Sequence, residues 1–279
     1  MRSPALIGFV LAALCIPRVG MGGTEQECIE ACLRENQQAS VGYQEIEQMC
    51  REMCTVTRAL QLVRSDDPDE YAEGVEILFN SDDPRAVAPL IDALRRDLEE
   101  RTGRWALIIP ALGAQRDEAA VPVLIETLTL PDDDWLGREM SADALGKIGS
   151  PSAIPALTTA AWRGDTRDEA IGALSLILDR RVVPTLISAL EPGEDSQTRE
   201  AAMEGLRRLG SEAVPDLVEA LAEYGPEHPE TERRVWICRL LGESGNAQSL
   251  AALEAIRSDP DPAVAQCAAA GIEAAKNGN

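Results

Sequence analysis

The chain has 279 residues, of which 48 are acidic and 26 basic, so its formal net charge is −22. This charge argues against an electrostatic grip on nucleic acid or on an anionic membrane. Hydrophobic residues make up 45% of the chain but aromatic residues only 3%, which favours helices packed through alanine and aliphatic side chains over a β-sandwich or barrel. The single histidine, His228, excludes sites built on several histidines.

Residues 1–23 have the features of a signal peptide. Arg2 precedes an apolar run over residues 5–16, which is shorter than the roughly 20 residues that span a bilayer. Small residues surround Gly22, where we expect cleavage. We therefore predict an exported protein, periplasmic or extracellular, without stable membrane insertion. A lipid on Cys15 or a retained membrane anchor is the alternative, and Leu14 before Cys15 argues against the lipid.

Two C-x3-C pairs lie in residues 24–64, within helix-like stretches at 25–38 and 43–64. A spacing of four places both sulfurs of each pair on one helix face. If the stretches fold back antiparallel, Cys28 meets Cys54 and Cys32 meets Cys50. An exported chain favours disulfides over a site of four thiolates around zinc, which stays the alternative. Residues 24–64 are thus predicted to form a disulfide-bonded helical hairpin that caps the following region.

Residues 65–279 repeat themselves. A block of apolar residues recurs every 29 to 35 residues, and its copies begin at Leu90, Leu124, Leu157, Leu186, Leu217 and Ala252. An arginine recurs at nearly the same intervals, about eight residues before a glycine-like step, at Arg138, Arg167, Arg199 and Arg234. Two helical patterns per repeat at this period indicate an all-α fold, an α-solenoid of about six helical pairs. Residues 262–276 are predicted to form a lone capping helix.

Residues 138–149 and 153–157, echoed by 234–242 and 213–217, resemble the phycobilisome-lyase type of HEAT-like repeat. The resemblance extends over about residues 66–279. It implies the solenoid fold, and it implies two kinds of function, because that family includes chromophore-lyase subunits as well as scaffolds. The first repeat departs from the pattern at Phe79 and Asn80, where the glycine step is expected. Pro110, inside the first helix of the second repeat, predicts a kink.

The recurring polar residues have structural interpretations. Each arginine of the repeated column is expected to reach an acid in a neighbouring repeat and tie the repeats together. The acidic clusters at residues 66–69, 82–83, 132–134, 191–195 and 259–261 are expected to cap helices rather than bind calcium, because they lack the spacing of a calcium-binding loop. We expect no metal site, no cofactor and no catalytic residue set.

Aromatic residues mark the candidate binding surface. Trp135, Trp162 and Tyr224 follow second helices, on the rim where repeats join, and exposed aromatics there suit binding. The alternative is that they pack under the next repeat. Asp92, Glu126 and Glu219 are expected to be exposed on the second helices. Cys238 and Cys267 are expected to be buried free thiols, with a disulfide between them as the alternative.

These features predict an exported, non-catalytic scaffold that binds a protein partner with a basic or mixed face through its concave or rim surface. The alternative function is that of a lyase-type enzyme subunit acting on a tetrapyrrole or its carrier protein, which the family resemblance implies. A third interpretation attributes the acidity to a salt-rich habitat, because Lys147 and Lys276 are the only lysines.

Overall fold

The computed structural model describes residues 24–37, 42–130, 135–225 and 231–277, and these residues contain helices and no strand. The chain divides into two compact units, residues 1–115 (unit 1) and 116–279 (unit 2). By sequence order, α4 to α15 make six pairs of a first and a second helix within the described residues, and α16 follows alone. The expected all-α solenoid is confirmed.

Unit 1 begins with a helical hairpin of α2 (Glu25–Glu35) and α3 (Tyr43–Leu62). Disulfides join Cys28 to Cys54 and Cys32 to Cys50, with Cα atoms 5.8 and 5.7 Å apart. These are the pairs expected from the spacing, and all four sulfur-bearing residues are buried. The two bridges fix one register between the helices, so the hairpin does not depend on a large apolar core.

The rest of unit 1 consists of α4 (Pro68–Phe79), the short turn η1 (Pro84–Ala86), α5 (Val87–Glu100) and α6 (Trp105–Gln115). Asp67 caps α4, since its carboxylate accepts from the backbone N–H groups of Asp69 and Glu70 at 2.9 and 3.1 Å. Helix α6 packs against both α4 and α5. Its buried Ile108 and Leu112 contribute to the core of the unit. Helix α6 continues through Pro110.

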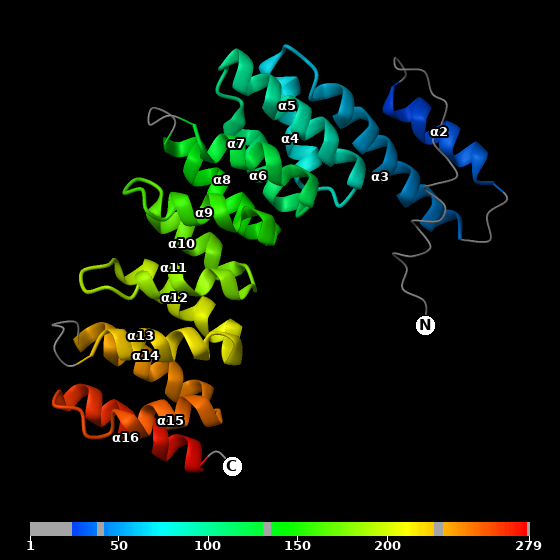
Figure 1. Cartoon of the computed structure of the whole chain (residues 1–279). Coiled ribbons are helices and arrows are strands. Elements are labelled where there is room, and N and C mark those ends of the chain that lie inside the picture. Colours follow the sequence, from blue (N-terminus) through cyan, green and yellow to red (C-terminus); the bar gives the residue numbers. More distant parts are fainter. Residues whose placement is uncertain (1–23, 38–41, 131–134, 226–230, 278–279) are drawn as a thin grey trace. The chain divides into compact units, whose positions relative to one another are not determined.

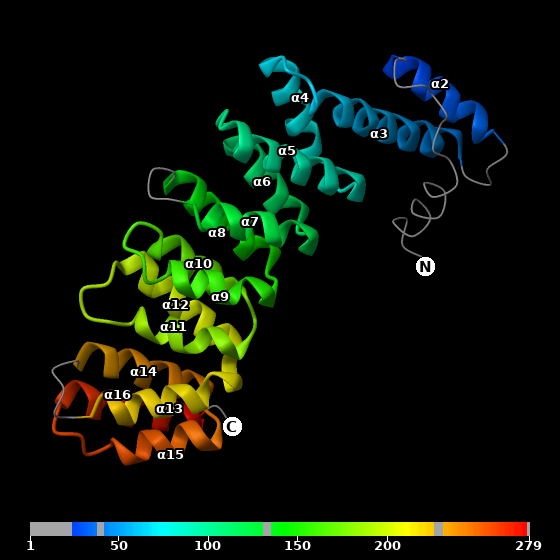
Figure 2. The ribbon, with the colours of Figure 1, turned by 45° about the horizontal axis from the view of Figure 1, so that its top comes forward.

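Unit 2 is a stack of helical pairs (Figures 1 and 2). Its first helices α8, α10, α12, α14 and α16 pack on one another in that order. The second helices α7, α9, α11, α13 and α15 contact these first helices. The bounds are α7 (Val121–Leu128), α8 (Trp135–Ile148), α9 (Ile154–Ala160), α10 (Arg167–Leu176), α11 (Val183–Ser188), α12 (Ser196–Leu209), α13 (Val214–Glu223), α14 (Thr231–Ser244), α15 (Ala247–Ala255) and α16 (Pro262–Asn277).

Local chemistry fixes where the second helices start. Proline occupies the first turn of α7, α9, α11 and α13, where its missing N–H has no intrahelical partner to lose. A 3₁₀ turn precedes each of these helices: η2 (Glu118–Ala120), η4 (Pro151–Ala153), η5 (Arg180–Val182) and η6 (Gly210–Glu212). Asp117 and Asp179 cap two of these turns by accepting backbone N–H bonds at 2.8 and 2.9 Å. These acids therefore serve as helix caps.

Close contacts between first helices require glycine at two positions. A Cβ on Gly146 of α8 would lie 2.7 Å from the Ala173 Cα of α10, and one on Gly205 of α12 would lie 2.8 Å from the Ser175 Cα. The repeated arginines predict the glycine-like step of α12 eight residues after Arg199, at Arg207, whereas the structure places it two residues earlier. Arg207 is exposed, and Gly205 makes the approach instead.

A third disulfide joins Cys238 of α14 to Cys267 of α16, whose Cα atoms are 6.3 Å apart. This corrects the expectation of free thiols. Gly242 of α14 and Gly271 of α16 are in close approach, since a Cβ on either would lie 3.2 Å from the Cα of the other. Each cysteine precedes the glycine of its own helix by four residues, so the same contact brings the two sulfurs together.

Several sequence-based expectations concern residues outside the described ranges. The cleavage site near Gly22, His228 and the acidic residues 132–134 are among them. No described helix is both long and apolar enough to cross a membrane.

Candidate binding surfaces

The loop edge of unit 2 comprises the described residues that join each second helix to the next first helix: 129–130, 161–166, 189–195, 224–225 and 256–261. The arginine column lies at this edge. Arg167 donates to Glu194 through Nε and Nη2, at 2.9 and 2.6 Å, and to the Ala161 carbonyl at 2.7 Å. Arg138 forms an ion pair with Asp165. These arginines therefore hold the loop ahead of the next first helix, as expected.

Arg234 and Asp259 form the most enclosed of these pairs. Their side chains are only 3% and 4% exposed. Burial is the largest single effect and works to raise the pKa of Asp259, but the hydrogen bonds from Arg234 and from the Asp261 backbone N–H, together with the charge of Arg234, hold the pKa below the ordinary value. Arg199 is different: it donates to the Glu194 carbonyl at 3.1 Å and stacks on Trp236, 5.4 Å from the ring centroid. The column is structural at each of these positions.

The predicted aromatic residues differ in exposure. Trp135 and Trp162 are 52% and 66% exposed. The guanidinium of Arg167 lies 5.8 Å from the ring centroid of Trp162. Tyr224 is half-buried, with Arg233 stacked 4.1 Å from its ring centroid. Trp135 and Trp162 can therefore offer a whole ring face or edge to a partner, whereas Tyr224 is partly committed to packing within unit 2.

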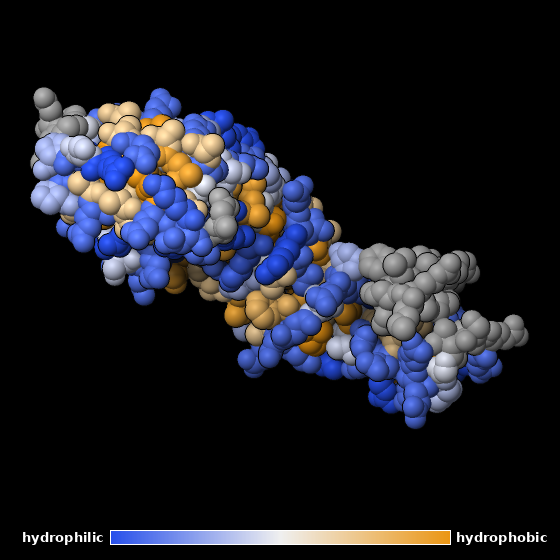
Figure 3. Space-filling model, turned by 90° about the horizontal axis from the view of Figure 1, so that it is seen from below, coloured by the Kyte–Doolittle hydropathy of each residue, from blue (hydrophilic) through white to orange (hydrophobic). Residues whose placement is uncertain are grey.

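The predicted acidic residues Asp92, Glu126 and Glu219 are all exposed. Asp92 belongs to α5 of unit 1, and the two glutamates lie on α7 and α13 of unit 2, so within unit 2 they are on non-adjacent second helices. In Figure 3 hydrophilic side chains predominate on the face shown, with apolar ones gathered in patches between them. The acids contribute charge to the surface rather than a defined cluster.

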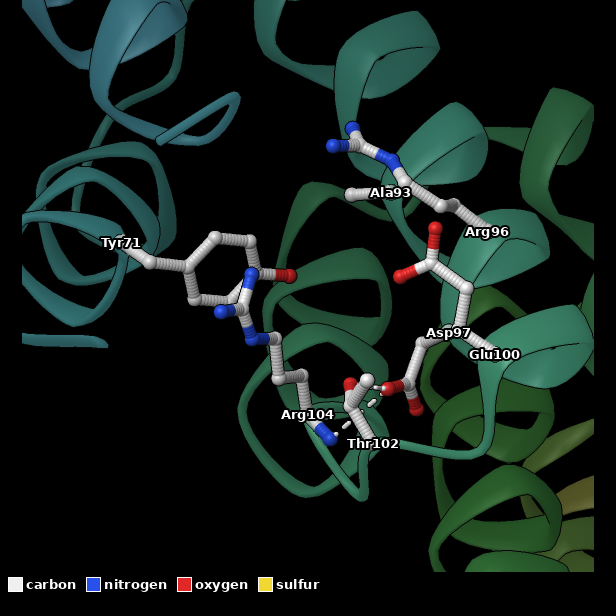
Figure 4. A pocket seen from close by; sticks show the side chains of 7 residues that line it. All are labelled: Tyr71, Ala93, Arg96, Asp97, Glu100, Thr102 and Arg104. Atoms are coloured by element: carbon white, nitrogen blue, oxygen red, sulfur yellow. Dashed lines mark hydrogen bonds between the residues drawn. The ribbon is translucent and has the colours of Figure 1, made fainter. Parts of the chain in front are cut away.

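Unit 1 holds a small pocket that the sequence did not predict (Figure 4). It has about 190 Å3 of empty volume, part of it open to solvent, and is lined by Tyr71, Ala93, Arg96, Asp97, Glu100, Thr102 and Arg104. Helix α4 supplies the tyrosine, α5 supplies residues 93–100, and the loop before α6 supplies the rest. No sequence motif predicts the pocket, because its residues come together only when the three helices pack.

Asp97 organises one wall of this pocket. It is buried and accepts the backbone N–H groups of Arg104 and Trp105, at 3.0 and 2.8 Å, and the hydroxyl of Thr102. It therefore caps the start of α6 from the end of α5. Across the pocket, Tyr71 is 2% exposed, and its hydroxyl has no hydrogen-bond partner among the described residues. Burial, and then the charge of Asp97, raise the pKa of Tyr71 to about 12, so its hydroxyl is a neutral donor.

Among the described residues, no group of three or more His, Cys, Asp or Glu side chains is arranged to hold a metal ion. Comparison with known families matches residues 104–175 to HEAT repeats and residues 198–223 to the PBS lyase HEAT-like repeat. Both matches fall within the region that the sequence pattern assigned to the array.

Three proteins illustrate the similarity. Bilin biosynthesis protein PecE of Mastigocladus laminosus is 35% identical over 106 residues, which cover 35% of this chain and 39% of PecE. The match thus spans about two fifths of that relative. Among solved structures, the complex of CpcE and CpcF of phycocyanin lyase from Nostoc sp. PCC7120 is 26% identical, with a TM-score of 0.47 and coverage of 77% of this chain and 85% of that one. Human deoxyhypusine hydroxylase is 20% identical, with a TM-score of 0.35 and coverage of 91% and 97%.

The match to PecE contradicts the predicted non-catalytic scaffold, since PecE is named for bilin biosynthesis. The prediction rested on the absence of recognisable catalytic motifs, and such motifs describe hydrolases, kinases and metalloenzymes better than proteins that handle a bilin. The repeats themselves are as expected. Residues 104–175 match HEAT repeats and residues 198–223 match the phycobilisome-lyase type of HEAT-like repeat.

Proposed function

We propose that this protein is a lyase-type subunit that acts on a tetrapyrrole or on the carrier protein of a tetrapyrrole. One observation carries the proposal: the 35% identity over 106 residues with a bilin biosynthesis protein. A bilin is a linear tetrapyrrole, a flat conjugated chain with anionic side groups. A protein that handles it needs apolar or aromatic faces for the rings and cationic or donor groups for the side groups.

The described residues supply both kinds of group. Trp135 and Trp162 expose aromatic rings at or beside the loop edge. The pocket of unit 1 supplies two guanidinium groups and the Tyr71 hydroxyl. These residues bind and orient in our account, and we assign no bond-making step to any of them.

We also propose a protein partner with a basic or mixed face. Exposed aromatic residues are frequent anchors of protein interfaces, and the exposed carboxylates of Glu126 and Glu219 would attract a positive face. With a formal net charge of −22, the chain should associate faster with such a partner at low ionic strength. In a purified complex, Trp162→Ala should weaken partner binding by more than about 1 kcal/mol. Leu178→Ala is the matched control, because Leu178 is also exposed, at 60%, but lies away from the loop edge.

Export is a separate proposal. If residues 1–23 act as a signal peptide, the intact mass of the exported protein should correspond to a start within a few residues of Gly22. A mass that retains residues 1–20, or that includes a diacylglycerol on Cys15, would contradict it.

The function is tested with the purified mature chain, phycocyanobilin and apo-phycocyanin. We expect saturable changes in the visible absorption of the bilin on binding, and a faster or more complete covalent attachment to phycocyanin, measured by protein mass. A chain that neither changes the absorption of the bilin nor affects its attachment would contradict the proposal. The control is Cys238→Ser/Cys267→Ser, which lacks the third disulfide. It shows how far a general loss of structure reduces bilin binding and attachment.

A further inference from the structure

The pocket of unit 1 contains the buried hydroxyl of Tyr71, which has no hydrogen-bond partner among the described residues. Tyr71 is 98% buried, yet no described group accepts from its Oη atom or donates to it. In Figure 4 the hydroxyl points into the pocket, toward the Glu100 side. Buried polar groups are nearly always hydrogen-bonded. An acceptor from outside the chain would complete this one.

Two guanidinium groups at the same pocket meet no carboxylate. The guanidinium of Arg104 stacks on the Tyr71 ring, 4.6 Å from the centroid, and within the described residues it donates only to the carbonyl oxygens of Ser65 and Asp66, at 3.4 and 3.1 Å. Arg96 lines the pocket and has no hydrogen bond or ion pair within the described residues. A guanidinium prefers a carboxylate, which it binds through two parallel hydrogen bonds. That preference is unmet here.

The two carboxylates of the pocket differ in availability. Asp97 is occupied by Thr102 and by two backbone N–H groups at the start of α6. Glu100 has no hydrogen-bond or ion-pair partner in the part of the chain that the structure describes, and in Figure 4 its carboxylate faces the pocket below Arg96. Glu100 therefore competes with any anion that enters. This predicts a charge preference that can be tested: neutralising Glu100 should strengthen the binding of an anion and weaken the binding of a cation.

The size of the pocket restricts what can enter. Its empty volume of about 190 Å3 includes space that is open to solvent, so the enclosed part of the pocket can take only a small group. It suits a terminal group on a larger molecule whose remainder lies outside. Linear tetrapyrroles carry such groups, because each of their two propionate side chains ends in a carboxylate.

We infer that Tyr71, Arg96 and Arg104 anchor a propionate carboxylate of the tetrapyrrole. The inference rests on the proposed function. The carboxylate accepts from the Tyr71 hydroxyl and from the two guanidinium groups, while the tetrapyrrole rings remain outside the pocket. The anchor positions the ligand and makes or breaks no bond.

The first experiment titrates the full mature chain with biliverdin and with biliverdin dimethyl ester, whose carboxylates are blocked, following visible absorption. Tyr71→Phe keeps the ring beneath Arg104 and removes only the hydroxyl. Tyr71→Phe and Arg96→Gln should each raise the Kd for biliverdin about tenfold. Neither should change the Kd for the ester. Arg95→Gln, one residue away on α5 but outside the pocket lining, is the matched control and should change neither value.

Glu100→Gln tests whether removing a negative charge from the pocket strengthens the binding of an anion. It should lower the Kd for biliverdin about threefold, because a repulsive charge is removed. A higher Kd for Glu100→Gln, or equal Kd values for biliverdin in wild type, Tyr71→Phe and Arg96→Gln, would overturn the anchor. Circular dichroism checks that each variant is folded, and Arg96→Gln carries the test if Tyr71→Phe is not.

A second titration separates the anchor from the proposed function. Glutarate offers carboxylates without a tetrapyrrole, and its binding is followed by the NMR signals of the arginine Nε–H groups. Glutarate binding that requires Tyr71, in a chain that binds no bilin, would support the carboxylate site and overturn the proposed function. Bilin attachment to phycocyanin that is insensitive to Tyr71→Phe and Arg96→Gln would do the reverse.

Discussion

Two arginines at the loop edge of unit 2 and the two arginines at the pocket of unit 1 have opposite surroundings. Arg167 and Arg234 at the loop edge of unit 2 each donate to a carboxylate, whereas Arg96 and Arg104 at the pocket of unit 1 meet none within the described residues. A solenoid repeats its side chains, so a paired arginine can be a tie that every repeat needs. An unpaired arginine beside an unpaired buried hydroxyl has no such structural reason. The difference teaches that an arginine paired with a carboxylate ties the fold together, whereas arginines without a carboxylate mark a candidate site where a buried hydroxyl beside them also lacks a partner among the described residues.

The largest expected difference comes from replacing one arginine of each unit by alanine. Arg234→Ala leaves Asp259 buried without its partner, which should lower the free energy of unfolding by about 3–5 kcal/mol. Arg96→Ala removes a side chain without a hydrogen bond or ion pair to any described residue, and it should change the free energy of unfolding by less than about 0.5 kcal/mol. Urea denaturation measures both. Equal losses in the two variants would show that Arg96 is also a structural tie.

The disulfides of the hairpin hold unit 1 by a different means. Cys28→Ser/Cys54→Ser opens the bridge with a sequence separation of 26 and should cost about 3 kcal/mol. The loss should be insensitive to salt, unlike that of an exposed ion pair. Limited proteolysis at several salt concentrations is the measurement. A hairpin that resists the protease equally well without this bridge would show that its second disulfide and its core suffice.

Much of the structural side of this comparison was predictable. The spacing of Cys28, Cys32, Cys50 and Cys54 defines a helix face, so the pairing followed from geometry. The arginine column and the capping aspartates recur with the repeat, so periodicity revealed them.

The remainder depends on how helices approach one another. The contact between Gly242 and Gly271 that aligns Cys238 with Cys267 requires the packing of α14 on α16. The pocket requires Tyr71 of α4 to face residues from α5 and from the loop before α6. Neither has a local pattern, because each residue is ordinary in its own helix. Trp135 and Trp162 were placed at the rim by sequence, but only the packing around Tyr224 showed that it differs from them.

Acidification should remove the contribution that the Arg234–Asp259 pair of unit 2 makes to stability. The pKa of Asp259 is lowered in the folded protein through Arg234, against the opposing effect of burial. The unfolded chain therefore binds more protons below the ordinary value of 3.8, and the contribution to stability is lost as the pH falls through the folded pKa. The free energy of unfolding should decline less steeply between pH 5 and pH 2 for Arg234→Ala than for wild type. Parallel curves would contradict the assigned coupling.

The smallest expected effect is at Tyr71. Because its hydroxyl has no hydrogen-bond partner within the described ranges, Tyr71→Phe should leave the free energy of unfolding unchanged, or raise it by up to about 1 kcal/mol, near neutral pH. The raised pKa of about 12 means that the wild type retains its neutral tyrosine below pH 10 and loses stability as the pH rises toward 12. Tyr71→Phe should lack that alkaline component. A decrease of more than about 1 kcal/mol in the free energy of unfolding at pH 7 would show that the Tyr71 hydroxyl makes a stabilising hydrogen bond.

The most direct test of the account is a crystal structure of the protein with a bound linear tetrapyrrole. We predict that one propionate carboxylate lies within hydrogen-bond distance of the Tyr71 hydroxyl and of Arg96 or Arg104, with the rings outside the pocket. A tetrapyrrole bound elsewhere with both carboxylates in solvent would contradict the anchor, and a chain that binds none at saturating concentration would contradict the function.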